Sequence, residues 1–407
     1  MHDPQQQAFN DIVMASLANL SERSIRRIQE LAKASEITDP KLMALPHPAR
    51  VNLMGTHEIQ QLQCGNDWPA VKAIVADATL PLHTTLQKLS QASELMAAMY
   101  GYSKFDDASS NDGFANGPIL AMRFSMAKGA LFQTTDALDK MLEHTDISDD
   151  IPIGAARAPY PVCYFEFGQS RTNPIKVYNQ STGWHQSEGC YVFEYRSPLI
   201  GYEELGEIRH IQLMLTGAPK ANIADDAYQI FTIPVIDEAD SVNKTMERYF
   251  ELHRKEVFIA NMIDPDSGYI MASDKELDVS KQAILHLIKI MLYLQSPGAM
   301  RKEDLQASVL KKQLENLKSS AKQAKAARRL QASYDRIVIG PARVEGDASG
   351  QGNHRLNEIH WRRGHYRNQP HGPQMSLRKV IWISPTVVTP AHMSGATEPE
   401  KRTYIIK

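Results

Sequence analysis

The spacing of apolar residues predicts a helical N-terminal region. Up to about residue 150, apolar positions recur every three or four residues, which predicts helices over residues 7–34, 69–102 and 118–144. A polar loop rich in Gly, Asn and Asp separates the last two of these segments. Residues 1–150 are therefore expected to form a mostly helical region.

The pattern changes to strand-like alternation after residue 150. Residues 162–167, 189–195, 208–216 and 228–233 are rich in aromatic and β-branched side chains, which predicts an antiparallel sheet of three to five strands. Pro159 and Pro161 place the start of the first strand at an edge. Helical spacing returns over residues 240–263 and 279–295. Residues 151–300 are expected to form a central antiparallel sheet with packed helices.

The densest clusters of basic residues lie in the C-terminal part of the chain, after residue 300. Residues 303–331 contain many Lys and Arg residues, few acids and a sparse apolar stripe, so residues 301–333 are expected to be a basic helical connector. A strand at 334–340, a Gly-rich stretch and a basic aromatic segment follow. Residues 334–407 are expected to form a small basic β-containing domain with a flexible tail. The predicted fold class is α+β.

Composition excludes several classes of protein. The 407-residue chain is 43% hydrophobic and 23% charged, with a formal net charge of -2, so bulk charge does not predict a polyanion binder. Three widely spaced cysteines, Cys64, Cys163 and Cys190, give no disulfide framework. The N-terminus lacks the pattern of a secretory signal, and no apolar run is long enough to span a membrane. We expect a cytoplasmic protein without a membrane partner.

One dense segment carries the candidate chemistry. Within residues 353–389, arginines, lysines and histidines alternate with aromatic residues, and Gly and Pro punctuate the run. Guanidinium groups bind phosphate, and aromatic rings stack on unpaired bases, so this mixture predicts contact with RNA. The predicted RNA-binding residues are Trp361, Arg362, Arg363, Arg367, Arg378 and Lys379.

A ribonuclease is an alternative interpretation of the same segment. Cleavage of RNA without a metal needs a base, an acid and cations that stabilise the phosphorane. His365 and His360 are the candidate acid and base, and Tyr366 is a further proton donor. Single-turnover cleavage of RNA that is lost in His365→Ala would identify such an enzyme. The histidine spacing matches no metal-binding motif, and no cofactor motif occurs, so neither a metal nor a cofactor is expected.

A non-catalytic protein-interaction module is the second alternative, since basic strands also form solvated faces. In that case, neutral substitutions at Arg362 and Arg363 change only solubility or folding. The sequence leaves the oligomeric state open.

The same segment resembles a known family. Residues 359–366 have the sequence IHWRRGHY, and residues 382–388 have the sequence WISPTVV. An Arg-Arg-Gly-His-aromatic motif followed by an apolar strand with Trp and Pro resembles the C-terminal domain of type V-A anti-CRISPR proteins that suppress biogenesis of the effector nuclease. The match covers about a tenth of the chain, and its specific part is Arg362-Arg363-Gly364-His365.

The resemblance implies an unusual activity. Such proteins, carried by phages, prophages and plasmids, recognise the N-terminal peptide of the effector during its synthesis, and the corresponding mRNA is lost. The implied partners are RNA or a ribosome–nascent chain complex and the N-terminal peptide of the target. The implied function is that of a post-transcriptional regulator encoded by a mobile element.

Overall fold

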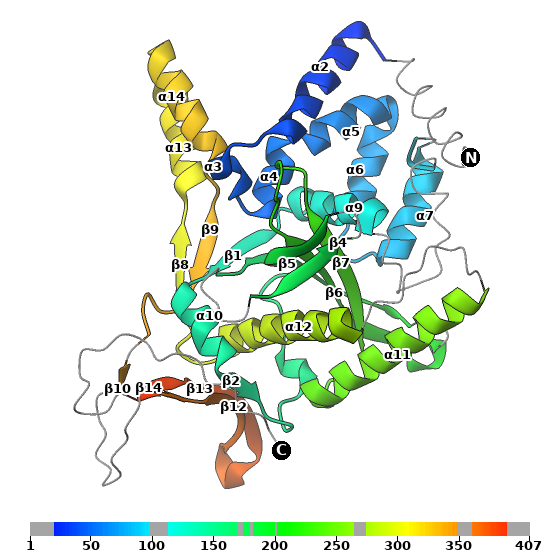
Figure 1. Ribbon diagram of the computed structural model, residues 1–407. Coiled ribbons are helices and arrows are strands. Elements are labelled where there is room, and N and C mark those ends of the chain that lie inside the picture. The colour runs from blue at the N-terminus through cyan, green and yellow to red at the C-terminus, as the bar shows by residue number, and fades with distance from the viewer. Residues whose placement is uncertain are drawn as a thin grey trace.

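The computed structural model has an α+β fold (Figure 1). It describes residues 20–93, 95–97, 113–168, 174–179, 182–199, 202–263, 274–344, 346–347 and 360–388. The described α-helices are α2 (Glu22–Ala32), α3 (Pro40–Met43), α4 (His47–Leu53), α5 (Thr56–Cys64), α6 (Trp68–Ala76), α7 (Leu82–Ala92), α9 (Gly113–Met126), α10 (Asp136–Glu143), α11 (Val242–Ile263), α12 (Asp274–Gln295), α13 (Gln306–Asn316) and α14 (Ser320–Gln331).

The strands in the described ranges belong to one large and two small sheets. In chain order they are β1 (Ala130–Thr134), β2 (Thr145–Ile147), β3 (Val162–Glu166), β4 (Lys176–Asn179), β5 (Gly183–Pro198), β6 (Glu207–Gly217), β7 (Ala227–Val235), β8 (Arg301–Asp304), β9 (Arg336–Ile339), β10 (Gly346–Asp347), β11 (His360–Arg362), β12 (Gly364–His371), β13 (Leu377–Ile383) and β14 (Thr386–Val388). The large sheet has the order β7-β6-β5-β3-β1-β9-β8, and β4 pairs with β5.

The large sheet is mixed: it contains the expected antiparallel ladder and also a parallel part that the sequence did not predict. β3, β5, β6 and β7 form the expected antiparallel ladder. β1 lies parallel to both β3 and β9, and it places β3 inside the sheet. Pro161 precedes the first residue of β3, so the missing N–H falls outside the ladder and does not require an edge.

The two faces of the large sheet pack against different helices. Cys163 and Phe165 point into a core with α10, α11 and α12, whereas Val162 and Tyr164 point into a core with α4 and α9. A third cluster lies among α5, α6, α7 and α9. Figure 1 shows this layered arrangement, with α12 across one face and the N-terminal helices over the other. Because successive side chains of β3 point to opposite faces of the sheet, this strand contributes to two different cores.

The segment predicted as one helix over 118–144 contains a strand. α9 ends at Met126, Lys128 has a positive φ of 55°, and the N–H of Gly129 donates to the carbonyl of Phe124 at 2.8 Å. A side chain at Gly129 would collide with Phe124 and Val162. This tight helix end turns the chain into β1, and its five residues enter the sheet as a strand.

The basic connector is a helical hairpin. β8 precedes it, β9 follows it, and these two strands pair antiparallel. Residues 317–319 separate α13 from α14, which pack against each other. The predicted strand at 334–340 is confirmed as β9, but it pairs with β1 of the large sheet. Sequence spacing identified the strand and not its partner.

All three cysteines lie in the interior of the protein. Cys64, Cys163 and Cys190 are free and buried, and burial raises the pKa of the Cys163 thiol to about 12. The cysteines are therefore core thiols.

Within the described ranges, no helix has both the length and the hydropathy required to cross a bilayer.

Candidate functional site

The candidate site lies on the small sheet β2-β12-β13. β12 and β13 form an antiparallel hairpin, and β2 adds to the other side of β12 in parallel. The segment between α10 and the large sheet thus holds the C-terminal hairpin against the body of the protein, as Figure 1 shows. A basic segment that is remote in sequence from β2 is fixed by backbone hydrogen bonds.

Residues that face each other across this sheet share one side of it. His365 pairs with Ile383, Arg367 with Ile381, Gln369 with Lys379 and His371 with Leu377. These eight residues form the outward face. Leu377 is 52% exposed and Ile383 is 37% exposed. His365, Arg367 and Lys379, three of the predicted site residues, therefore lie on one open surface.

The opposite side of the hairpin packs on the core. Tyr366 is fully buried, and its hydroxyl donates to the carbonyl of Lys289 at 2.6 Å. Its ring stacks on Trp382, whose indole N–H donates to the hydroxyl of Thr145 at 3.2 Å. Burial raises the pKa of Tyr366 well above its ordinary value. The structure therefore gives Tyr366 a packing role, and we do not retain it as a proton donor.

Gly364 makes the close approach between β12 and the chain that follows β13. A Cβ atom at this position would lie 2.6 Å from the carbonyl oxygen of Ile383 and 2.6 Å from Pro385. The N–H of Gly364 donates to the carbonyl of His144 at 2.9 Å. The glycine of the Arg-Arg-Gly-His motif is thus required by backbone packing.

Trp361 and Arg362 lie on a separate sheet. β11 pairs with β14, so Trp361 stands opposite Val387 and Arg362 opposite Thr386. The ring of Trp361 stacks on His144, with the centroids 4.5 Å apart and the planes 17° apart. His144 covers one face of the indole, whereas Arg362 is exposed. Trp361 can offer at most its other face to a base.

Arg363 forms an exposed ion pair with Asp146 of β2. The Nη1–Oδ2 distance is 3.1 Å, and the two side chains are 64% and 59% exposed. Asp146 also stands beside His365 in the register of β2 and β12. An exposed pair of this kind contributes little to stability. Its consequence is electrostatic, since Asp146 neutralises part of the positive charge next to the outward face.

The two histidines proposed as an acid–base pair belong to different sheets. His360 lies on β11, and its side chain is outside the described residues. The neighbours of His365 on the outward face are Asp146 and Ile383. His371 lies on the same face but six residues further along, or about 20 Å in an extended strand. The described strands therefore place no second histidine opposite or directly beside His365.

Arg378 and Lys379 separate at the turn end of the hairpin. Lys379 is on the outward face, whereas Arg378 shares the other face with Val380. The Nη1 group of Arg378 donates to the carbonyl of Met375 at 2.7 Å, and the side chain is exposed. Arg378 is therefore partly committed to holding the turn.

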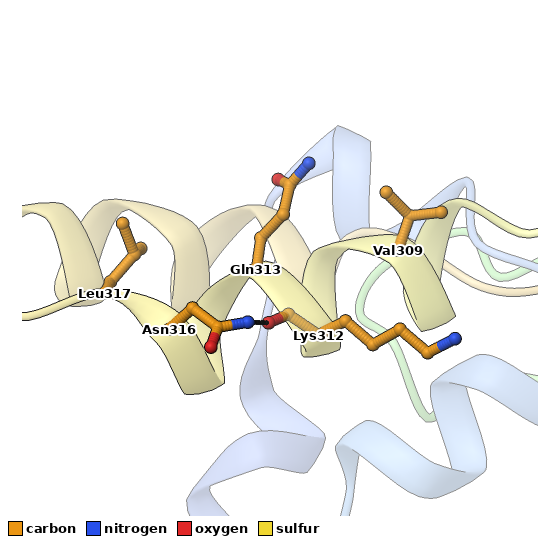
Figure 2. Close-up of a pocket in the computed structure, with 5 residues that line it drawn as sticks. All are labelled: Val309, Lys312, Gln313, Asn316 and Leu317. Atoms are coloured by element: carbon orange, nitrogen blue, oxygen red, sulfur yellow. Dashed lines mark hydrogen bonds between the residues drawn. The ribbon is translucent and has the colours of Figure 1, made fainter.

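An open groove of about 470 Å³ lies along α13, and Figure 2 shows the residues that line it. α13 itself lies far from the C-terminal sheet (Figure 1). Val309, Lys312, Gln313, Asn316 and Leu317 line it, so Lys312 is the ionisable member of the lining. In the parts of the chain that the structure covers, no three His, Cys, Asp or Glu side chains gather as a metal site.

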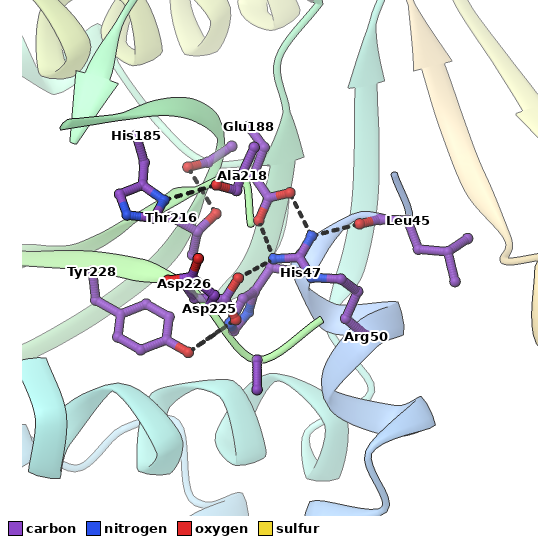
Figure 3. A network of polar contacts seen from close by, with 12 residues as sticks. Leu45, His47, Arg50, His185, Glu188, Thr216, Ala218, Asp225, Asp226 and Tyr228 are labelled. Atoms are coloured by element: carbon purple, nitrogen blue, oxygen red, sulfur yellow. Dashed lines mark hydrogen bonds and ion pairs between the residues drawn. The ribbon is translucent and has the colours of Figure 1, made fainter. Parts of the chain in front are cut away.

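A buried polar cluster around Arg50 involves residues that the sequence did not single out. Arg50 is fully buried and donates to both carboxylate oxygens of Glu188, at 2.6 and 2.7 Å, and to Asp226 at 2.5 Å (Figure 3). His47 contacts the hydroxyls of Tyr191 and Tyr228. Burial lowers the pKa of Arg50, but the two carboxylates outweigh this effect and raise it overall. The cluster joins α4 to β5 and β7.

A second buried cluster lies beneath α12. The hydroxyl of Thr134 donates to one carboxylate oxygen of Asp139 at 2.7 Å, and the other oxygen lies 2.9 Å from Nε2 of His286. All three side chains are buried. Both hydroxyl and imidazole contact the carboxylate instead of each other, so the arrangement ties α10 and α12 to β1. No local sequence pattern links residues so far apart.

The protein thus combines an α+β fold with an open basic face on a small appended sheet. A family model described as AcrVA2-like, the anti-CRISPR type V subtype A2 family, matches residues 132–390. Because the match spans well over half of the chain, the protein belongs to this AcrVA2-like family. The resemblance inferred from the C-terminal motif is confirmed.

Two further comparisons complete the picture. A solved structure described as the crystal structure of AcrVA2 is 12% identical in sequence, with a TM-score of 0.45. The similarity covers 85% of this chain and 99% of that chain. A comparison with curated proteins gave no match.

Proposed function

We propose that this protein is a post-transcriptional inhibitor of a type V-A CRISPR effector. It binds the N-terminal peptide of the effector during translation, contacts RNA through the outward face of β12 and β13, and causes loss of the mRNA. Family membership supports the target class. The observation that carries the RNA contact is the gathering of His365, Arg367 and Lys379 on one exposed face beside Arg363.

The chemistry of this face suits the backbone of single-stranded RNA. Arginine and lysine supply charge-assisted hydrogen bonds to phosphate, and the histidine rings add N–H donors. Exposed Leu377 and Ile383 lie at the two ends of β13 and offer apolar contact to splayed bases. Because the face is a sheet and not a cleft, it binds an extended strand better than a compact ligand.

The outer edge of β13 supports the peptide-binding part of the proposal. Among the described strands, β13 pairs only with β12, so its seven residues present backbone groups to an added strand. β8, at one end of the large sheet, is a weaker candidate because it has four residues with the sequence RKED. Short charged edge strands discourage strand addition.

Substitutions on the outward face and at the adjoining Arg363 should weaken RNA binding in a salt-dependent manner. We expect Arg363→Gln/Arg367→Gln/Lys379→Gln to lower the slope of log affinity against log salt by about 2 units, since each lost phosphate contact on a single strand contributes about 0.7. Fluorescence anisotropy of a labelled single-stranded RNA over a salt series measures this. Asp146→Asn should have the opposite effect on affinity, because it releases Arg363 from its ion pair.

The matched control removes the same charge elsewhere. Lys72→Gln/Lys88→Gln/Lys176→Gln replaces three exposed lysines of α6, α7 and β4. An identical slope for the outward-face variant and this control would remove the RNA contact from the proposal.

Peptide recognition predicts a dependence on the encoded amino acids. A reporter carrying the first codons of a type V-A effector gene should lose its mRNA when this protein is co-expressed. Synonymous recoding of these codons should leave the loss intact. Two compensating single-nucleotide frameshifts, which change the peptide but little of the RNA, should abolish it. Quantitative PCR measures the level of reporter mRNA in each case. If synonymous recoding prevents the loss of mRNA, or the frameshifted reporter still loses it, peptide recognition is contradicted.

A further inference from the structure

The hairpin of α13 and α14 is an arm that projects from the edge of the large sheet (Figure 1). Its residues are mostly exposed, and Leu310 is the buried residue of α13. The arm contains seven basic residues, from Lys311 to Arg329, against the single acid Glu315. The arm therefore lacks a wide apolar face that could be buried against the rest of the protein.

Three cations of α14 lie on one side of the helix. Lys322, Lys325 and Arg329 follow the spacing i, i+3, i+7, and all three are exposed. They span about 10 Å along the axis. Lys318 precedes the helix at the tip of the arm and continues the run. We call Lys322, Lys325 and Arg329 the basic stripe.

The basic stripe destabilises the helix that carries it. Like charges three and four residues apart repel each other, and Lys322 also stands near the positive end of the helix dipole. A helix that is simply solvated alternates acids with bases. Within the described residues, no ion pair engages the stripe. An external polyanion would offset this repulsion.

The root of the arm is fixed. β8 and β9 form a continuous antiparallel ladder beneath it. Arg336 of β9 forms an ion pair with Asp304 of β8 at 2.9 Å, and the N–H of Ser308 donates to Asp335 at 3.0 Å. These contacts hold the first turn of α13 to the start of β9. The stripe is thereby presented in a constant direction, which lowers the entropy lost on binding.

We propose that the basic stripe is a second nucleic-acid site, which binds the phosphodiester backbone without reading sequence. Residues 306–331 contain no aromatic side chain, so they lack both the stacking groups that recognise bases and the anchors typical of protein interfaces. Small residues, including Ala321 and Ala324, lie beside the cations and let a backbone approach closely. The arm and the C-terminal sheet lie at opposite ends of the molecule in Figure 1, so this site is separate from the proposed one.

The test neutralises the stripe in the full-length protein. Lys322→Gln/Lys325→Gln/Arg329→Gln keeps good helix formers in α14, and circular dichroism verifies the fold. We expect the slope of log affinity against log salt for single-stranded RNA to fall by about 2 units. The Lys72/Lys88/Lys176 variant, which loses equal charge, serves as the control. A slope equal to that of the control would overturn the proposal.

Three further experiments identify the ligand and separate the two sites. An equal loss with DNA of the same sequence assigns the phosphate backbone as the ligand, and a loss confined to RNA assigns RNA. Polyglutamate is also tested as a competitor for the bound RNA. If it competes as well as unlabelled RNA of equal total charge, the proposal is overturned in favour of an acidic protein partner. The stripe substitutions are also combined with those at Arg363, Arg367 and Lys379, and independent sites should lower the slope additively. The stripe result stands whether or not the outward face binds RNA.

Discussion

Arg50→Met should lower the free energy of unfolding by about 3–5 kcal/mol, the usual cost of removing one partner from a buried ion pair. The substitution leaves Glu188 and Asp226 as two buried carboxylates without their shared cation. Methionine fills most of the space, so the loss is electrostatic more than steric. Urea denaturation followed by tryptophan fluorescence at pH 7 measures the change.

Two control variants separate the electrostatic cause from packing. Arg27 forms an exposed pair with Glu58 at 2.7 Å, with side chains 46% and 45% exposed, so Arg27→Met should be far less destabilising. Adding Glu188→Gln to Arg50→Met should restore part of the lost stability, because it removes one of the orphaned charges. If Arg50→Met costs no more than Arg27→Met, the buried network is not the link between α4 and the sheet that we describe.

Glu166→Gln should remove a pH dependence of stability worth about 3 kcal/mol. Glu166 ends β3 and accepts a hydrogen bond from the hydroxyl of Tyr334 at 2.9 Å. Burial raises the pKa of Glu166 from 4.5 to about 7, although Tyr334 and Arg336 act to lower it. The folded protein therefore holds this proton more tightly than the unfolded chain does.

The direction of the effect follows from this difference. Below pH 4.5 the carboxyl is protonated in both states, and its contribution to stability is complete. Between pH 4.5 and about 7 the unfolded chain ionises first, so the wild-type protein loses stability as the pH rises. Urea denaturation at pH 5, 6, 7 and 8 should show Glu166→Gln gaining on the wild type through this window.

Tyr334→Phe provides the matched comparison for Glu166. It deletes the hydrogen bond that stabilises the carboxylate, so the pKa of Glu166 rises further and the window moves to higher pH. A stability difference between the wild type and Glu166→Gln that stays constant from pH 5 to pH 8 would show that the carboxyl titrates as it does in the unfolded chain.

Local sequence patterns predicted many elements of this fold. Apolar alternation identified β3, β6 and β7, and helical spacing over residues 279–295 identified most of α12 and its end. Serine is favoured at helix starts, and the hydroxyl of Ser21 accepts a hydrogen bond from the N–H of Ser24 at the start of α2. These signals depend on neighbours within about one turn or one strand, so they can be seen without the fold.

The pairing of the strands within the sheets could not be predicted from local sequence patterns. β1 was hidden in a helical pattern because its five residues are too few to show a period of their own. Its pairing with β9 joins residues about 200 positions apart, and only the closed sheet determines it. The buried contact between Arg50 and Glu188 likewise depends on α4 lying against β5. A lone arginine in a helical segment gives no sign of burial.

The C-terminal segment illustrates the division for the candidate site. The sequence by itself determined the basic and aromatic composition of residues 353–389, the Arg-Arg-Gly-His motif and the family that it resembles. Only the tertiary structure decided that Tyr366 faces the core while His365 and Arg367 face outward. The reason is that composition is a property of the chain, whereas the face of a strand that is buried depends on what packs against it. Here that is α12, which takes the aromatic side of the hairpin and leaves its charged side exposed.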